Sequence, residues 1–452
     1  MSPTHRSLRP SRTVIAFVAA FALMACTGKA LDTAAPSRGP AAAATPRSAP
    51  GTPEPAAIAP SDDAGLVIGR SGEEGLQLTL AASGERILAL PMGVPGRNWS
   101  QLLSAAVTGG STTIRDLRLP DLESSSQTID GAWRLPTIGL DPTPVGVSDD
   151  GRTIVLVEDE ATPDAAAKKA VSRFVIVDRT RVAKPRTVEL AGEFEYDTLS
   201  PDGSILYVVE HLAGPPDGHY QVRALDTATG VLRDGAVADK NEGDEAMAGW
   251  PIAQARRPDG MVFTLYHGAE HPFIHALSSV DAWALCIDLP ATGASDTAAA
   301  SDWGLTATVD GRSLIAANAT LGLAVDISLS DLSIRRSVTF APSASTGISL
   351  AKFGHDVGGE VGRRIVASPA GSVVYAAGSG GIVALATSDL SLEGRFLEGV
   401  PVDAMAVTLD GGTIYALIHA GGRIVRLDAG SGRIVGEVPG GGYDRLAAVV
   451  PW

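Results

Sequence analysis

Short alternations of hydrophobic and polar residues, separated by turn signals, run through most of this chain. Residues 199–231 show the pattern most clearly. Residues 205–209 form a run with high β-propensity, and residues 220–225 alternate between polar and apolar side chains. The segments 200–203 (SPDG) and 227–230 (TATG) have turn composition, because Pro presets φ, Asp bonds to nearby backbone and Gly accepts a positive φ. The pattern predicts antiparallel strands joined by tight turns.

The same unit, a turn followed by a hydrophobic run, recurs along the chain. Six further copies begin at residues 94–98 (degenerate), 147–151, 257–260, 309–311, 368–371 and 409–411. Their mean spacing is about 52 residues, which is typical of an array of small sheets. A ring of such sheets buries both faces of each and leaves only short edges. We therefore predict an all-β fold, a β-propeller of four-stranded antiparallel blades. The alternatives are a pair of β-sandwiches and an open solenoid, and the repeats of a solenoid are usually shorter than these.

The number of blades follows from the length of the globular part. Residues 63–452 hold seven units of about 52 residues with a short remainder, so the arithmetic favours seven blades. Eight blades stay open for a specific reason. Residues 76–80 and 85–90 have the pattern of two more outer strands, and residues 443–450 that of one more inner strand. Together these segments would join the two ends of the chain in one blade.

The first 25 residues have the pattern of a secretion signal. Arg6, Arg9 and Arg12 precede an apolar core at 14–25, which is too short to span a bilayer comfortably. The segment 23–26 (LMAC) resembles the signal of bacterial lipoproteins. That resemblance implies cleavage before Cys26 and a lipid on its thiol. An ordinary secretory signal is the alternative, and both place the protein outside the cytoplasm, on the periplasmic or cell-surface side.

Residues 26–62 are rich in Ala, Pro, Ser and Thr, which predicts an extended tether between a lipid anchor in the membrane and the propeller. The formal net charge of −15 disfavours nucleic acid and anionic lipid headgroups as partners. Cations, sugars, peptides or other proteins remain as partners.

If Cys26 carries lipid, Cys286 has no cysteine to pair with, and we expect it to be a buried small hydrophobic residue.

In antiparallel blades, the loops after the second strand and before the first strand lie at the same end. We expect these loops to bring the candidate ligand-binding residues together at the mouth of the central channel. The candidates after second strands are Glu158, Glu210, His211, His267, His271 and His419. Those at first strands are Glu195, Asp197, Trp250, Asp302, Trp303, Arg363, Arg364, Asp403 and Asp444. Polar residues also end strands at any loop, so solvation of strand ends is the alternative explanation. Glu195 and Asp197 are two residues apart, so both side chains are expected on one face of a strand.

One local pattern indicates metal chemistry. Residues 267–271 (HGAEH) have the H-x-x-E-H spacing of inverted zinc peptidases, which requires a helix. Here the segment follows a strand, contains Gly268 and precedes Pro272, so a loop is predicted instead. We expect no cofactor. The alternative is a divalent transition metal held by a looser set of His211, His267, His271 and His275.

The repeats SPDGSILYVVE and VTLDGGTIYALI resemble those of YVTN-type propellers of bacterial envelopes, whose relatives include lactonase-like and TolB-like propellers. The resemblance covers most of residues 64–452 and implies a fold rather than an active site. Residues 224–230 are similar to the quinoprotein repeat but lack its Trp. The sequence favours a membrane-tethered, non-enzymatic module that binds a ligand or scaffolds a protein. The alternative is a lactonase-like or metal-assisted hydrolase using Glu210, His211, His267 and His271.

Overall fold

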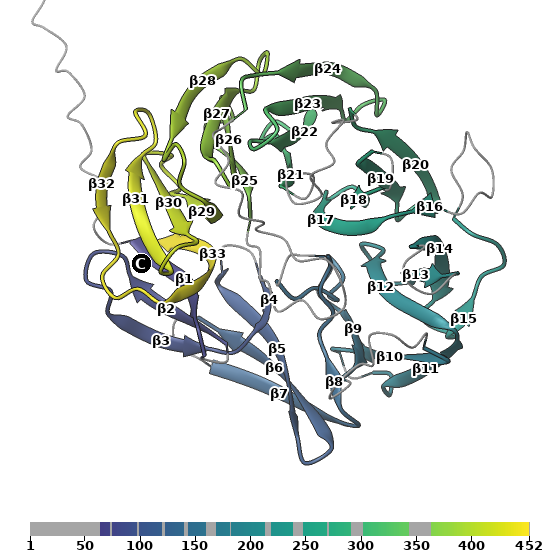
Figure 1. Ribbon diagram of the computed structural model, residues 1–452. Coiled ribbons are helices and arrows are strands. Elements are labelled where there is room, and N and C mark those ends of the chain that lie inside the picture. The colour runs from purple at the N-terminus through teal and green to yellow at the C-terminus, as the bar shows by residue number, and fades with distance from the viewer. Residues whose placement is uncertain are drawn as a thin grey trace, which may run out of the picture. The chain divides into compact units, whose positions relative to one another are not determined.

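The strands form eight antiparallel blades arranged in a ring (Figure 1). The computed structural model describes residues 64–72, 75–96, 99–119, 123–139, 143–159, 169–180, 182–212, 218–237, 247–268, 271–290, 302–342 and 363–451. The predicted all-β propeller of four-stranded blades is confirmed. The preferred count of seven blades is wrong, and the open alternative of eight blades is correct.

Blade 1 combines strands from both ends of the propeller, and blades 2 to 4 follow the chain in order. Blade 1 combines β33 (Tyr443–Pro451) with β1 (Ala64–Arg70), β2 (Leu76–Leu80) and β3 (Arg86–Leu90). Blade 2 contains β4 (Gly93–Pro95), β5 (Gln101–Thr108), β6 (Ser111–Arg118) and β7 (Glu123–Asp130). Blade 3 contains β8 (Trp133–Arg134), β9 (Thr153–Glu158), β10 (Val171–Asp178) and β11 (Arg186–Ala191). Blade 4 contains β12 (Glu193–Leu199), β13 (Ile205–His211), β14 (His219–Asp226) and β15 (Val231–Leu232), and the short β16 (Met247–Ala248) also pairs with β14.

The other four blades follow the chain in order. Blade 5 contains β17 (Trp250–Arg256), β18 (Met261–His267), β19 (Phe273–Ser278) and β20 (Trp283–Asp288). Blade 6 contains β21 (Trp303–Ala307), β22 (Ser313–Asn318), β23 (Leu323–Ser328) and β24 (Ile334–Thr339). Blade 7 contains β25 (Ile365–Ala367), β26 (Val373–Gly378), β27 (Gly381–Ala386) and β28 (Leu392–Phe396). Blade 8 contains β29 (Val402–Val407), β30 (Thr413–Ile418), β31 (Arg423–Asp428) and β32 (Ile434–Glu437).

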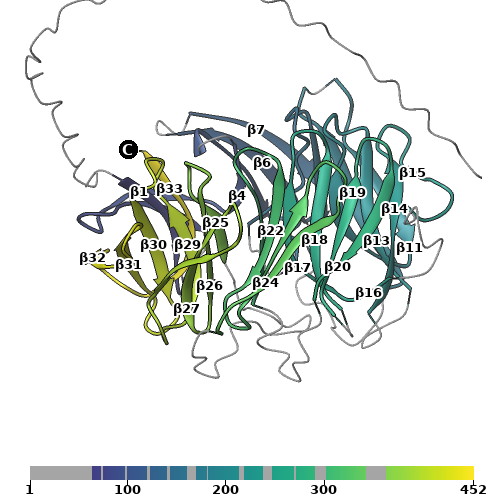
Figure 2. The same ribbon diagram turned by 90° about the horizontal axis from the view of Figure 1, so that it is seen from above.

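The first strand of each blade lies nearest the axis of the ring, and the fourth lies outermost (Figure 1). Because the strands are antiparallel, the connections alternate between two ends. We call the end with the first-to-second and third-to-fourth connections the turn end. The opposite end, with the second-to-third and inter-blade connections, is the loop end. From above, β13, β18 and β22 of neighbouring blades run in similar directions, so these ends coincide from blade to blade (Figure 2).

The recurring Asp-Gly turn is built as the sequence predicts. The Asp202 carboxylate accepts hydrogen bonds from the Ser200 hydroxyl at 2.7 Å and the Ser204 N–H at 3.0 Å. These bonds hold the pKa of Asp202 below its usual value. Gly203 has a φ of 70°, a conformation that favours glycine. The turn therefore fixes the register of the two inner strands of the blade.

A tyrosine of the second strand joins one blade to the next. The Tyr207 hydroxyl donates to the backbone carbonyl of Ser279, in the turn of blade 5, at 3.0 Å. The Tyr375 hydroxyl donates in the same way to Ala429 of blade 8 at 3.1 Å. Both side chains are buried, so the bond satisfies a hydroxyl that would otherwise be costly to bury. The tyrosine of the repeat thus has a structural role between blades.

The described residues contain eight clusters of buried hydrophobic side chains, and each cluster lies between two successive blades. One joins blade 8 to blade 1 and another joins blade 1 to blade 2, so the ring is closed. A single sheet could not bury both of its faces, and the neighbouring blades provide that cover.

Blade 1 closes the ring by pairing the two ends of the propeller. β33 is antiparallel to β1, from the pair Ala64↔Pro451 to the pair Arg70↔Tyr443. The Arg70 guanidinium lies 4.8 Å from the centre of the Tyr443 ring. This is the terminal blade that the patterns at residues 76–90 and 443–450 left open.

The proposed signal, Cys26 and the tether lie outside the described residues. Within the described part, the structure shows no helix long and apolar enough to cross a bilayer. Cys286 is only half-buried, because it lies on the outermost strand of blade 5, where its sulfur is 3.6 Å from that of Met247.

Candidate functional site

Strand register brings together the loop-end residues that the sequence identifies. Glu193 lies opposite His211 in blade 4, Trp250 opposite His267 in blade 5, and Trp303 opposite Asn318 in blade 6. The beginnings of first strands and the ends of second strands therefore share one end of the ring.

Three of the candidates belong to the outer part of their blades. Glu158 pairs with Arg173 on the third strand of blade 3 at 3.0 Å. Glu210 pairs with Arg223 on the third strand of blade 4 at 2.7 Å. His271 lies 2.9 Å from Asp288, on the outermost strand of blade 5. Their partners direct these side chains away from the axis of the ring.

The four histidines of the metal hypothesis lie in different surroundings and do not share one set of contacts. His211 lies 3.3 Å from Glu195, and His271 contacts Asp288. His275 is buried on the third strand of blade 5, and its ring lies edge-on to the Tyr266 ring at 6.4 Å. Burial lowers the pKa of His267. Glu270 lies outside the described residues, and among those described no group of three or more His, Cys, Asp or Glu side chains is arranged to hold a metal.

The loop end of blades 4 and 5 does gather several candidates around a small cavity. The cavity has a volume of about 30 Å³. Its lining comes from these two blades and from the segment after β8: Thr137, Ile138, Gly139, Glu195, Tyr196, Asp197, Val209, His211, Tyr220, Gly249, Pro251, Thr264 and Tyr266. The Trp250 ring stacks beside the His211 ring, with centroids 6.4 Å apart. We call the group of Glu195, Asp197, His211 and Trp250 the inner cluster.

Asp197 occupies an unusual position in β12. Tyr196 pairs with Val208 and Thr198 with Tyr207, so Asp197 is the extra residue of a β-bulge. The bulge aims its carboxyl group inward, where only 2% of the residue is exposed. Gln254 donates to this carboxylate at 3.2 Å. Solvation of a strand end does not explain Asp197.

Burial raises the pKa of Asp197 to about 7. The charge of Arg256 and the hydrogen bond from Gln254 lower it by smaller amounts. Glu195, two residues earlier, is half-exposed and contacts His211. The two carboxyl groups line one cavity but have different surroundings, and Asp197 is the buried one of the two.

Three buried tyrosines complete the lining. Burial raises the pKa of Tyr196 to about 12, and it also raises the pKa values of Tyr220 and Tyr266. The Tyr220 and Tyr266 rings stack with centroids 4.8 Å apart. These hydroxyls stay protonated at neutral pH and can donate hydrogen bonds. Sequence reasoning missed all three, because tyrosine in a strand is equally typical of a core.

A second cluster of loop-end residues joins blades 6, 7 and 8. Arg364 and Asp302 form a fully buried ion pair at 2.5 Å. The other oxygen of Asp302 accepts from the Thr320 hydroxyl at 2.6 Å and the Ser379 N–H at 3.2 Å. Both oxygens of Asp302 are therefore satisfied by groups of two blades, so we assign this cluster a structural role between blades.

The remaining candidates lie in blades 1, 6, 7 and 8, and only some of them are near the second cluster. His419 contacts the Asp403 carboxylate at 3.0 Å. Burial raises the pKa of Asp403, and the charges of His419 and Arg364 oppose that rise. Burial raises the pKa of Asp444 in blade 1 as well. Trp303 is 1% exposed and belongs to the core between blades 5 and 6, whereas Arg363 is exposed.

The comparisons with known proteins extend only to the fold. No family model and no curated protein matches this chain. Among solved structures, the chain resembles the dihydro-heme d1 dehydrogenase NirN in complex with DHE, at 14% identity, over 88% of this chain and 79% of that chain, with a TM-score of 0.50. It also resembles the periplasmic gluconolactonase PpgL of Pseudomonas aeruginosa (17% identity, 77% of this chain and 97% of that chain, TM-score 0.40). The Dos1 propeller matches at 10% identity, over 78% of this chain and 84% of that chain, with a TM-score of 0.43. At these identities the likeness shows a β-propeller and no activity.

Proposed function

We propose that this protein is a binding module whose ligand is held at the inner cluster, on the loop end of blades 4 and 5. The observation that carries the proposal is the convergence of Glu195, Asp197 and His211 on one cavity beside the Trp250 ring. Burial raises the pKa of Asp197, and a perturbed titratable group inside a concavity is typical of a functional site. At the second loop-end cluster the buried Asp302 is already paired with Arg364 and accepts hydrogen bonds from Thr320 and Ser379.

The chemistry of the inner cluster favours a ligand that donates hydrogen bonds. Carboxylate oxygens accept hydrogen bonds, so sugar hydroxyls or an amine match the half-exposed Glu195. The half-buried Trp250 adds a flat apolar surface beside them. A cavity of about 30 Å³ admits one small polar group. The rest of the ligand therefore lies over the loop end, with one group inserted.

The test is a binding screen with matched variants of the full chain. Neutral sugars and small amines are screened by calorimetry against the wild type, Glu195→Gln and Glu158→Gln. Both substitutions remove a loop-end carboxylate, but Glu158 pairs with Arg173 toward the outer strands. We expect Glu195→Gln to weaken binding about tenfold, the effect of losing one charge-assisted hydrogen bond, and Glu158→Gln to leave it unchanged. Equal losses in both variants would contradict this placement.

One observation favours a second candidate, a lactonase-like hydrolase. A carboxyl group that titrates near pH 7, beside a histidine–glutamate contact, has the properties of a general base. Asp197 would take a proton from water as the water attacks a lactone carbonyl, and return it to the ring oxygen as the C–O bond breaks. Hydrolysis of a sugar δ-lactone that is lost in Asp197→Asn would establish this function. Binding without any product would retain the first proposal.

We also propose that the propeller is a YVTN-type repeat protein held outside the cytoplasm by lipid on Cys26. The support is the LMAC segment after a short apolar core and the proline-rich stretch that follows it. Fractionation tests this. The wild type should partition with membranes, and Cys26→Ser should be released from them. Retention of the variant in the membrane fraction would contradict lipidation at this residue.

A further inference from the structure

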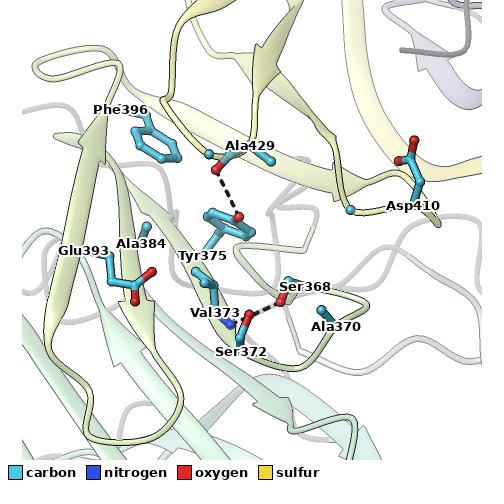
Figure 3. A pocket seen from close by; sticks show the side chains of 12 residues that line it. Ser368, Ala370, Ser372, Val373, Tyr375, Ala384, Glu393, Phe396, Asp410 and Ala429 are labelled. Atoms are coloured by element: carbon cyan, nitrogen blue, oxygen red, sulfur yellow. Dashed lines mark hydrogen bonds between the residues drawn. The ribbon is translucent and has the colours of Figure 1, made fainter. Parts of the chain in front are cut away.

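A second and larger cavity lies at the turn end, between blades 7 and 8 (Figure 3). Its volume is about 230 Å³. The lining comes from both blades: Ser368, Ala370, Ser372, Val373, Tyr375, Ala384, Glu393, Phe396, Asp410, Gly411, Ala429 and Gly430. It lies at the opposite end of the blades from the inner cluster, so it is a separate site and does not depend on the proposed function.

Aromatic rings and small residues shape this cavity. Tyr375 and Phe396 are buried, and their ring centroids are 6.2 Å apart. The Tyr375 hydroxyl donates to Ala429, which keeps the ring in place against blade 8. Ala384 and Gly430 present little side-chain volume, so the space over the rings stays open. An apolar surface of this kind receives a flat or aliphatic ligand body.

A departure from the repeat adds a polar group at the edge of the cavity. In four other turns, a serine or threonine hydroxyl donates to the aspartate two residues later: Ser148 to Asp150, Ser200 to Asp202, Thr308 to Asp310 and Thr408 to Asp410. In blade 7 the position of that aspartate is taken by Ala370. The Ser368 oxygen still accepts from the Val373 N–H at 3.1 Å. Without an aspartate at position 370 the hydroxyl is free to rotate, so its second lone pair can accept a hydrogen bond from a cationic ligand.

The charge of the lining is entirely negative. Glu393 from β28 and Asp410 from the turn of blade 8 lie on different sides of the cavity (Figure 3). Among the described residues, no lysine, arginine or histidine lines it. The charge of Glu393 reaches the Tyr375 ring, because the pKa of Tyr375 is raised first by burial and then by the charges of Glu393 and Asp428. Such a field favours a cation over a neutral or anionic ligand.

We propose that the cavity between blades 7 and 8 binds a small organic cation with a flat or apolar body, whose charged group lies between Glu393 and Asp410. An engineered cavity of about 150 Å³ holds benzene, so the present volume suits a ligand of about nine non-hydrogen atoms. Benzamidine has this size and charge. Benzamide is its neutral counterpart of nearly the same shape, and benzoate is a similar anion.

The experiment is titration of the full-length chain with these three probes, by calorimetry and by ligand-observed NMR. Benzamidine should bind saturably, while benzamide and benzoate should bind far more weakly or not at all. Glu393→Gln removes one charge from an exposed position and should weaken benzamidine binding about threefold. Gly430→Leu places a side chain in the cavity and should abolish binding. Gly430 does not require a positive φ, so the backbone tolerates the change.

Ala228→Leu in blade 4 is the matched control, because Ala228 occupies the same turn position as Gly430. It should leave benzamidine binding unchanged. The proposal is overturned if no probe binds saturably, if benzamide binds as well as benzamidine, or if Gly430→Leu binds benzamidine like the wild type. None of these outcomes involves Glu195 or His211, so failure here is distinguishable from failure at the inner cluster.

Discussion

Asp197→Asn should stabilise the protein, and the gain should grow with pH. Burial raises the pKa of Asp197 from 3.8 to about 7. Between those values the folded chain binds a proton that the unfolded chain has released. Below about pH 4 this group is protonated in both states and does not destabilise the fold. The free energy of unfolding then falls as the pH rises to about 7. A shift of about three units corresponds to a cost of about 4 kcal/mol for the buried charged form above neutral pH.

Urea unfolding of the wild type and Asp197→Asn measures this cost. The asparagine keeps an oxygen to accept the hydrogen bond from Gln254, and it removes the charge. The variant should gain about 3 kcal/mol more, relative to the wild type, at about pH 8 than at about pH 5. Comparing the two chains cancels the titration of groups that do not contact Asp197. A stability difference that is the same at both pH values would refute the assignment of a raised pKa to this carboxyl group.

Three further changes test the architecture, each by urea unfolding. Tyr207→Phe removes the hydroxyl that reaches Ser279 and should cost about 1 kcal/mol; no loss would show that this bond does not join the blades. Arg364→Ala leaves Asp302 charged and buried and should cost about 3–5 kcal/mol. Arg423→Ala is the control for Arg364→Ala, because it breaks only an exposed ion pair with Glu437, and it should cost less than about 1 kcal/mol. Equal losses of stability in the two variants would contradict the structural role of the buried pair. Truncation before residue 443 removes the innermost strand of blade 1 and should abolish a single cooperative transition, and an unchanged urea midpoint would contradict closure of the ring by β33.

The fold was largely predictable, because the interactions that form each turn involve residues that are close together in the sequence. The bonds of Asp202 and the positive φ of Gly203 are local, so the SPDG segment predicts them directly. The number of blades was harder to predict. The mean repeat length includes long inter-blade segments, such as residues 340–364, whereas all of blade 8 lies between residues 402 and 437. Length arithmetic therefore underestimated the count, while the strand pattern at the two ends of the chain was the better guide.

The site was predictable only as one end of the ring. Antiparallel order places Glu210 and His211 together at the loop end, but their side chains point to opposite faces of β13. Glu210 meets Arg223 and His211 meets Glu195, a difference set by cross-strand register. The bulge at Asp197 has no signal in the sequence that we could identify. The turn-end cavity did have a signal in the sequence, because Ala370 stands where the other turns have the aspartate of the Asp-Gly pattern.

Hydrogen–deuterium exchange with bound ligand shows directly whether the ligand lies at the inner cluster. The full chain is compared with and without the sugar or amine that the screen identifies as its tightest ligand. Binding at the inner cluster should slow exchange at residues 193–199, 208–212 and 249–253, which contain its four side chains. Protection confined to the turn end, at residues 368–375 and 428–432, or no ligand-dependent protection at any peptide, would contradict binding at the inner cluster.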